Sequence, residues 1–241
     1  MIIKVCGMRE TENINAVAGL GIDMMGFIFY PKSSRYVQMI SAMTGVLPDY
    51  SEERLNRVRG KNVTATAEKS RPKRVGVFVD DMPQNIVTRV YNYDLDFVQL
   101  HGDESPVMIE NLKRTLVPDI VPDIKIIKAL SIREKDDVKR WRDYEGVADM
   151  LLFDTKCKTH GGSGEQFDWS VLEAYDGTIP FLLSGGIGPE DAGRVKAFRH
   201  PQMVGIDLNS RFEISPALKD VEKLKTFIRQ IREAEGELQT V

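Results

Sequence analysis

The sequence predicts an α/β protein in which residues 1–241 form one domain, a (β/α)8 barrel of the TIM-barrel class. Eight short apolar segments alternate with segments of helical apolar spacing, and eight such units in 241 residues suit a class that typically uses about 250. The apolar segments lack clean polar–apolar alternation, as expected of parallel strands covered on both faces. An open, doubly wound sheet is the rival. It usually has fewer strands and a glycine-rich turn after the first strand, where this chain has only Gly7.

Each expected strand is a short apolar run that ends at a polar or glycine-containing turn. In chain order the strands are residues 2–6, 24–29, 75–79, 97–100, 124–130, 150–153, 180–183 and 203–208. The expected helices have apolar residues at helical spacing, and Pro83 and Pro106 lie in the first turns of two of them. In chain order the helices are residues 9–20, 37–47, 80–91, 105–116, 133–142, 169–175, 190–198 and 218–234.

The composition excludes several classes of protein. With 42% hydrophobic and 29% charged residues, the chain is typical of a soluble globular protein with a sizeable core. A net charge of -3 argues against nucleic acid as a partner, and no apolar run approaches the roughly 20 residues that cross a membrane. The N-terminus lacks a signal-peptide layout, so we expect Cys6 and Cys157 to be reduced thiols in the cytoplasm. No Cys/His spacing matches a zinc site.

One segment interrupts the strand–helix rhythm. Residues 49–74 are rich in charged residues, Ser and Thr, with few large apolar side chains. Unstructured connections are seldom this long in compact domains, so we expect a charged surface extension of the second helix or a surface loop. A basic docking patch is the functional alternative, although charge runs are usually only solvated.

In a barrel, the carboxyl ends of all strands face one cup, where the chemistry of this class takes place. The residues expected there are Cys6, the loop 33–35, Asp80, His101, Lys128, Asp154, Ser184 with Gly185 and Gly186, and Asp207 with Ser210. Cys6 is either a small buried hydrophobe or a thiolate base or nucleophile. Asp154 caps the next turn or acts as an acid opposite Cys6, a pair that suits a proton-transferring isomerisation.

Three further features suggest ligand contacts. Arg35 has the planar fork that binds a carboxylate at two points, unless it is only a surface arginine. His101 is either a structural donor or a titrating group. The glycines at 161, 162 and 164 and the run 184–189, which contains Gly185 and Gly186, expose backbone N–H groups that suit a phosphate. The loops after the seventh and eighth strands are the recurring phosphate site of this fold.

Seven motifs, in order along nearly the whole chain, resemble the phosphoribosylanthranilate isomerase family. They are Lys4-Val5-Cys6-Gly7, residues 26–36 with Pro31-Lys32-Ser33-Ser34-Arg35-Tyr36, residues 75–79, Gln99-Leu100-His101-Gly102, Asp154-Thr155 with residues 161–164, Leu183-Ser184-Gly185-Gly186-Ile187, and Gly205-Ile206-Asp207. Many phosphate-binding barrels share the glycine motifs. The first-strand Cys-Gly, the loop ending in Arg35-Tyr36 and the Gln-Leu-His-Gly are more selective.

The resemblance implies an Amadori rearrangement of N-(5-phosphoribosyl)anthranilate in tryptophan synthesis, without cofactor or metal. It implies that Cys6 is the general base, Asp154 the general acid, and Arg35 the ligand of the anthranilate carboxylate. It places the phosphate at Gly162-Ser163, Gly185-Gly186 and Asn209-Ser210, with His101 and Asp207 as further substrate-binding residues. A small-molecule substrate is thus the expected partner, and the chain itself is expected to be a monomer or a homodimer.

The sequence departs from the family pattern at Asn209-Ser210-Arg211-Phe212, where a small residue and a glycine are common after the last strand. Arg211 is therefore a possible extra phosphate contact. Two alternatives remain open: another phosphosugar isomerase or epimerase, and a non-catalytic protein that binds a phosphate ligand. A bifunctional isomerase acting also on a histidine precursor would want an acid where this chain has Cys6.

Overall fold

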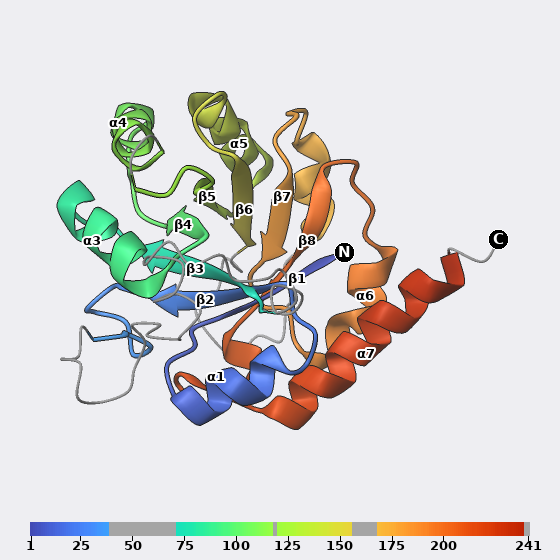
Figure 1. The fold of residues 1–241 in the computed structure, drawn as a ribbon. Helices are drawn as coiled ribbons and strands as arrows, with labels where there is room; N and C mark the ends of the chain where they lie inside the picture. Colours follow the sequence, from blue (N-terminus) through green and yellow to red (C-terminus); the bar gives the residue numbers. More distant parts are fainter. Residues whose placement is uncertain (39–70, 118–119, 156–167, 239–241) are drawn as a thin grey trace.

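A computed structural model of the chain describes residues 1–38, 71–117, 120–155 and 168–238 (Figure 1). Eight parallel strands close into a barrel in the order in which they occur in the sequence. They are β1 (Ile2–Cys6), β2 (Met24–Ile28), β3 (Lys73–Phe78), β4 (Phe97–Leu100), β5 (Lys125–Ile132), β6 (Met150–Thr155), β7 (Phe181–Ser184) and β8 (Met203–Leu208). Pairing of β1 with β8, from Ile2 opposite Gly205 to Val5 opposite Leu208, closes the ring. Closure confirms the (β/α)8 barrel and excludes the open sheet.

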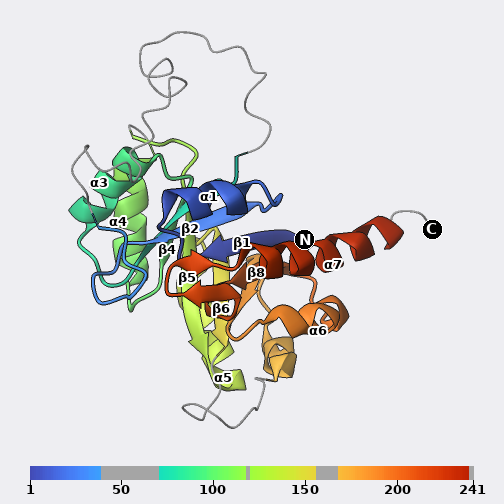
Figure 2. The same cartoon turned by 90° about the horizontal axis from the view of Figure 1, so that it is seen from below.

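Helices surround the strands on the outside of the barrel (Figure 1). The α-helices are α1 (Thr11–Ala18), α3 (Pro83–Tyr93), α4 (Pro106–Leu116), α5 (Lys135–Val138), α6 (Ala192–Ala197) and α7 (Val221–Leu238). Short 3-10 helices are η1 (Lys139–Tyr144), η2 (Trp169–Ala174), η3 (Pro189–Asp191) and η4 (Ser210–Phe212). The predicted start of α4 is confirmed, since Ser105 Oγ accepts a hydrogen bond from Met108 N at 3.2 Å. Helices α1 and α7 contact each other beside the closing strands (Figure 2).

Two apolar clusters explain why the strands are apolar along their whole length. The larger cluster lies between the strands and the helices and includes Val5 and Leu151. The smaller cluster fills the inside of the barrel and includes Ile127 and Leu152. Because successive side chains of a strand point to opposite faces, a strand with both faces covered needs apolar residues at consecutive positions.

Several predicted boundaries are wrong for identifiable reasons. The C-terminal helix begins at Val221 and not at 218, because a short antiparallel hairpin, β9 (Glu213–Ser215) and β10 (Leu218–Lys219), precedes it. The helix expected at 133–142 is one α-helical turn followed by η1. Lys73 and Arg74, assigned to the charged extension, are the first residues of β3.

The second predicted helix, residues 37–47, and the extension 49–74 lie mostly outside the described residues. At the start of that helix, Val37 N donates to Ile28 O at 2.9 Å, a contact that continues the pairing of β2 and is not helical. No helix within the described ranges has both the length and the apolar content needed to cross a membrane.

Candidate active site

Most of the predicted site residues lie at one mouth of the barrel, where the strands have their carboxyl ends. Cys6 ends β1, and Asp154 is the next-to-last residue of β6. Cys6 is on the same face of its strand as Ile2, which packs against the interior cluster, and Asp154 is on the same face as Leu152, which belongs to that cluster. Strands β7 and β8 lie between β6 and β1, so the two candidate catalytic groups face one interior from strands three positions apart.

Cys6 is buried beside a pair of charged groups. Its exposure is 3%, and a Cβ atom at Gly26 of β2 would lie only 2.7 Å from its Sγ, so the missing side chain at Gly26 makes room for the thiol. Lys4, two residues earlier on the same face, is fully buried and donates from Nζ to Asp207 Oδ1 at 2.9 Å. Ser184 Oγ donates to the other oxygen of Asp207 at 3.3 Å.

The electrostatics of Cys6 reflect two opposing effects. Burial raises the pKa of the Cys6 thiol, because a thiolate loses its hydration inside the barrel. The positive charges of Lys4 and Lys219 oppose this rise. Burial alone would lower the pKa of Lys4, but Asp207 and Cys6 outweigh it and hold that pKa above its ordinary value. The two lysines therefore favour the thiolate in a place where burial disfavours it.

Asp154 lies beside an imidazole whose orientation is fixed by an amide. His101 Nε2 is 3.4 Å from Asp154 Oδ2, and Gln99 Nε2 is 3.0 Å from His101 Nδ1. An amide nitrogen only donates, so in this arrangement Nδ1 accepts and the ring proton is on Nε2, facing Asp154. Gln99 is 1% exposed, and within the described residues its Oε1 accepts no hydrogen bond. Turning the amide by half a rotation would place Oε1 opposite an Nδ1–H and make Nε2 an acceptor.

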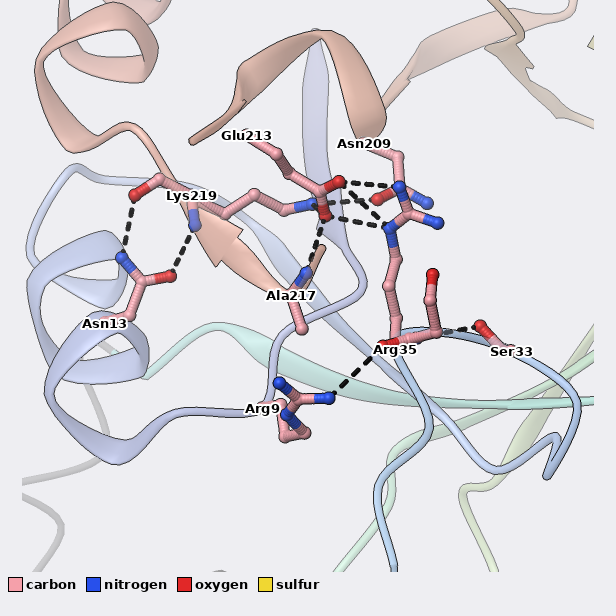
Figure 3. Close-up of polar contacts among 9 residues, drawn as sticks. Arg9, Asn13, Ser33, Arg35, Asn209, Glu213, Ala217 and Lys219 are labelled. Carbon is pink, nitrogen blue, oxygen red and sulfur yellow. Dashed lines mark hydrogen bonds and ion pairs between the residues drawn. The ribbon is translucent and has the colours of Figure 1, made fainter. Parts of the chain in front are cut away.

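Arg35, the expected carboxylate ligand, is on the loop after β2 and pairs with a residue for which the sequence predicts no function. Its guanidinium donates to the Glu213 carboxylate of β9, from Nη2 at 2.6 Å and from Nε at 2.8 Å (Figure 3). Lys219 of β10 donates to the same carboxylate at 2.7 Å and to Asn209 Oδ1 at 2.8 Å. The hairpin therefore links Arg35 to the loop after β8.

A pocket opens on the flank of the mouth, next to the loop that carries Arg35. Its walls come from the loops after β1 and β2 and consist of Arg9, Glu10, Pro31, Ser33, Tyr36, Val37 and Gln38. Cys6 and Asp154 are not among these residues. The pocket therefore lies beside the candidate carboxylate ligand and apart from the candidate acid and base.

The predicted phosphate loops are described in part. Gly185 and Gly186 follow β7 with φ angles of 95° and 67°, a region that favours glycine. Asn209 and Ser210 follow β8; Ser210 is exposed, whereas the Asn209 side-chain oxygen accepts from Lys219. Gly162 and Ser163 lie outside the described residues.

Two further expectations for the cup need correction or refinement. Lys128 does not face the barrel interior: its neighbours Ile127 and Ala129 do, and Lys128 pairs with Glu104 at 3.0 Å on the helix side of β5. Arg211, a possible phosphate contact, is exposed and forms an ion pair with Glu190.

Four polar residues of the site were missed as functional candidates: Lys4, Gln99, Glu213 and Lys219. The sequence contains a signal for Lys4 and Gln99, because each is a polar residue inside an apolar strand. A polar side chain buried there needs a hydrogen-bonding or charged partner. Glu213 and Lys219 gave no such signal, since they lie in a segment that the sequence divides between a loop and a helix. Within the described ranges, no three His, Cys, Asp or Glu side chains form a group that could hold a metal ion.

A closed parallel (β/α)8 barrel whose polar side chains gather at the carboxyl ends of the strands defines a barrel enzyme. The family model for N-(5'phosphoribosyl)anthranilate (PRA) isomerase matches residues 49–230. An N-(5'-phosphoribosyl)anthranilate isomerase of Parabacteroides distasonis is 46% identical over 231 residues, which cover 96% of this chain and 93% of that protein. The chain therefore belongs to the PRA isomerase family. Its members are isomerases of tryptophan biosynthesis that act on a small-molecule substrate.

Solved structures agree with this assignment. A phosphoribosyl anthranilate isomerase in complex with reduced 1-(o-carboxyphenylamino)-1-deoxyribulose 5-phosphate has a TM-score of 0.70 at 28% identity, covering 97% of this chain and 100% of that one. Monomers generated from the dimeric isomerase of Thermotoga maritima have a TM-score of 0.69 at 28% identity, with the same two coverages.

Proposed function

We propose that this chain converts N-(5'-phosphoribosyl)anthranilate to 1-(2-carboxyphenylamino)-1-deoxyribulose 5-phosphate, with Asp154 as general acid and Cys6 as general base. The observation that supports this most directly is the position of the two groups, which face the same interior from β6 and β1. An Amadori rearrangement needs one group that gives a proton and one that removes a proton, held on a single substrate.

The first step is ring opening. Protonated Asp154 gives its proton to the ribose ring oxygen, the bond from that oxygen to the first sugar carbon breaks, and the anthranilate nitrogen supplies the electron pair that forms an iminium. His101 is within reach of Asp154, with Nε2 3.4 Å from Oδ2. The half-turned Gln99 amide would make Nε2 an acceptor and so stabilise the protonated acid, which supports a role for the buried Gln99 in setting the proton position.

The second step is proton removal by the Cys6 thiolate. The proton leaves the second sugar carbon, its electron pair forms the carbon–carbon double bond of an enolamine, and the iminium nitrogen recovers its lone pair. Tautomerisation then gives the ketone. The first carbon is reduced and the second oxidised, so the electrons balance within the substrate. Lys4 and Lys219 favour the thiolate that this step requires.

The substrate would be held at both ends, which orients the reacting carbons between acid and base. Arg35 would bind the anthranilate carboxylate. Gly185, Gly186 and Ser210 would bind the phosphate through the loops after β7 and β8, together with Gly162 and Ser163 outside the described residues. Asp207 takes part through Lys4 and Ser184, which it joins beneath the substrate. A monomer or a homodimer is compatible with this site, which uses residues of one chain.

The test follows the loss of substrate fluorescence with the purified protein. Cys6→Ala and Asp154→Asn should each lower kcat by at least about 100-fold, the smaller end of the contribution of general acid–base catalysis. Asp136→Asn, an exposed aspartate on α5, is the matched control and should keep full activity. Full activity in both site variants would refute the assigned roles.

A second experiment tests whether the chain is an enzyme or a non-catalytic protein that binds a phosphate ligand. The unchanged chain should restore growth without tryptophan to a bacterium that lacks its own isomerase, and Cys6→Ala should not. Failure of the unchanged, folded chain to restore growth would contradict the proposed function.

A further inference from the structure

The hairpin β9–β10 places the buried carboxylate of Glu213 at the centre of a network at the barrel mouth. The network consists of Arg35, Glu213, Lys219 and Asn209. Only 5% of the Glu213 side chain is exposed. Its Oε1 accepts from Arg35 Nε at 2.8 Å, Lys219 Nζ at 2.7 Å and Ala217 N at 3.2 Å, and its Oε2 accepts from Arg35 Nη2 at 2.6 Å. With its oxygens occupied in this way, Glu213 is suited to hold other groups in place and not to exchange protons.

The contact with Glu213 uses only one edge of the Arg35 guanidinium. Nε and Nη2 form the edge that meets the carboxylate, whereas Nη1 points away from it and has no partner among the described residues (Figure 3). The stem of Arg35 occupies the space beside Gly7, because its Cδ lies 2.7 Å from where a Cβ of Gly7 would be. A side chain at Gly7 would therefore push Arg35 out of place. The second edge of the guanidinium, Nη1 with Nη2, remains suited to another carboxylate.

The charges of the network leave Arg35 able to bind an anion. Arg35 and Lys219 carry two positive charges against the one negative charge of Glu213, so the group keeps a surplus of one positive charge. Burial acts to raise the pKa of Glu213, but the hydrogen bonds from Arg35 and Lys219 outweigh it and hold that pKa below its ordinary value. Burial lowers the pKa of Lys219, and Glu213 opposes that change. Glu213 is therefore ionised at neutral pH without neutralising the whole site.

The hairpin that carries Glu213 is itself fastened to the barrel. Asn13 of α1 donates from Nδ2 to Lys219 O at 2.9 Å and accepts from Lys219 N at 2.8 Å. For Glu213 to leave Arg35, it would also have to leave the buried ammonium of Lys219. A substrate carboxylate is thus expected to add to the free edge of Arg35 and not to displace Glu213.

We propose that Glu213 is a positioning residue that sets the specificity for an aromatic carboxylate: it holds Arg35 by one edge so that the other edge receives the carboxylate of the substrate. This inference rests on the proposed function of Arg35. It predicts that the loss of Glu213 impairs recognition of the carboxylate and leaves recognition of the rest of the molecule intact.

The experiment measures binding by calorimetry of two probes. One is reduced 1-(o-carboxyphenylamino)-1-deoxyribulose 5-phosphate, and the other is the same molecule without the ring carboxylate. Glu213→Gln should raise the Kd of the first probe by about 10- to 100-fold, the range expected when charge-assisted hydrogen bonds to a carboxylate are lost, and leave the Kd of the second unchanged. Glu110→Gln, which removes an exposed partner of Arg114 on α4, should change neither Kd.

Equal weakening of both probes by Glu213→Gln would overturn the proposal, because a general structural role predicts that result. Unchanged binding of both probes would overturn it as well. If Glu213→Gln does not fold, Glu213→Asp keeps the charge but draws it back by one methylene, and it should give a smaller loss confined to the carboxylated probe. Failure of the unchanged chain to bind either probe would instead refute the proposed function, so the two failures are distinguishable.

Discussion

Two lysines of this barrel are alike in burial and pairing but differ in what they face. Lys4 on β1 and Lys128 on β5 are both fully buried, and each pairs with a carboxylate, Asp207 at 2.9 Å and Glu104 at 3.0 Å. Lys4 points into the barrel beside Cys6. Lys128 points outward, lies 5.4 Å from the centre of the Tyr144 ring and donates to Gly102 O at 2.6 Å. One pair lies in the candidate active site, and the other fastens the loop after β4 to the scaffold.

The comparison shows that burial and charge do not by themselves identify a functional residue in a parallel barrel. The side of the strand decides, because a shift of one position moves a side chain from the interior to the helix layer. Both pairs would leave an uncompensated buried charge if one partner were removed. Only the Lys4 pair should also change the chemistry.

The largest effect is expected for Lys4→Met. It leaves Asp207 as an unpaired buried charge, which should cost about 3–5 kcal/mol of unfolding free energy. It also removes the nearest cation that favours the Cys6 thiolate, so kcat should fall by about 100-fold or more. Thermal unfolding and the fluorescence assay measure the two effects. The double variant Lys4→Met with Asp207→Asn should recover stability but not activity. If activity recovered as well, Lys4 would have no role in the reaction.

A purely structural effect is expected for Lys128→Met. Its loss leaves Glu104 buried without its ammonium partner, again at a cost of about 3–5 kcal/mol in stability. Activity per folded molecule should stay close to that of the unchanged chain, because Lys128 faces away from Cys6 and Asp154. Adding Glu104→Gln should restore most of the stability. A large loss of kcat in the folded variant would show that the outward pair also orders the site, through His101 on the same loop.

The smallest effect is expected for Lys219→Met, and it appears in the pH profile. Burial raises the pKa of Cys6, and Lys219 is one of the cations that oppose this rise. Without it the pKa of Cys6 rises further, so less thiolate is present at neutral pH, and the rising limb of kcat/KM, which reports ionisation of the base, moves to higher pH. Activity should fall several-fold at neutral pH and recover in alkaline buffer. Lys223→Met on the exposed face of α7 is the control, and an unshifted limb would contradict the role of Lys219.

The barrel could be predicted because its pattern is repeated eight times. Every strand lies within a few residues of its expected position, and Cys6 and Asp154 lie at the carboxyl ends of their strands, as the pattern predicts. Lys128 was misplaced because the run around it is apolar on both faces. Without alternation, the sequence does not reveal which neighbour points inward.

The partners of Arg35 could not be predicted for a different reason. Glu213 is 178 positions from Arg35 in the sequence, and the hairpin that brings them together is only five residues of strand within a segment that the sequence divides between a loop and a helix. A contact at such distance depends on the closing of the barrel and leaves no local pattern. The sequence predicts that Arg35 binds a carboxylate of the substrate, but it does not reveal the carboxylate of Glu213 that holds Arg35 in the structure.

The pairing of β1 with β8, which joins the two ends of the chain, has a consequence for the order of folding. The contacts that complete the surroundings of Cys6 span nearly the whole chain: 203 positions from Lys4 to Asp207 and 206 from Asn13 to Lys219. Loop closure over such spans is entropically costly and slow, so these contacts are expected to form late in folding. A growing chain therefore exposes its thiol long before it makes Asp207 and Lys219, the late-sequence charges that surround it. The rate at which activity recovers during refolding would therefore measure the rate at which β8 pairs with β1 and closes the barrel.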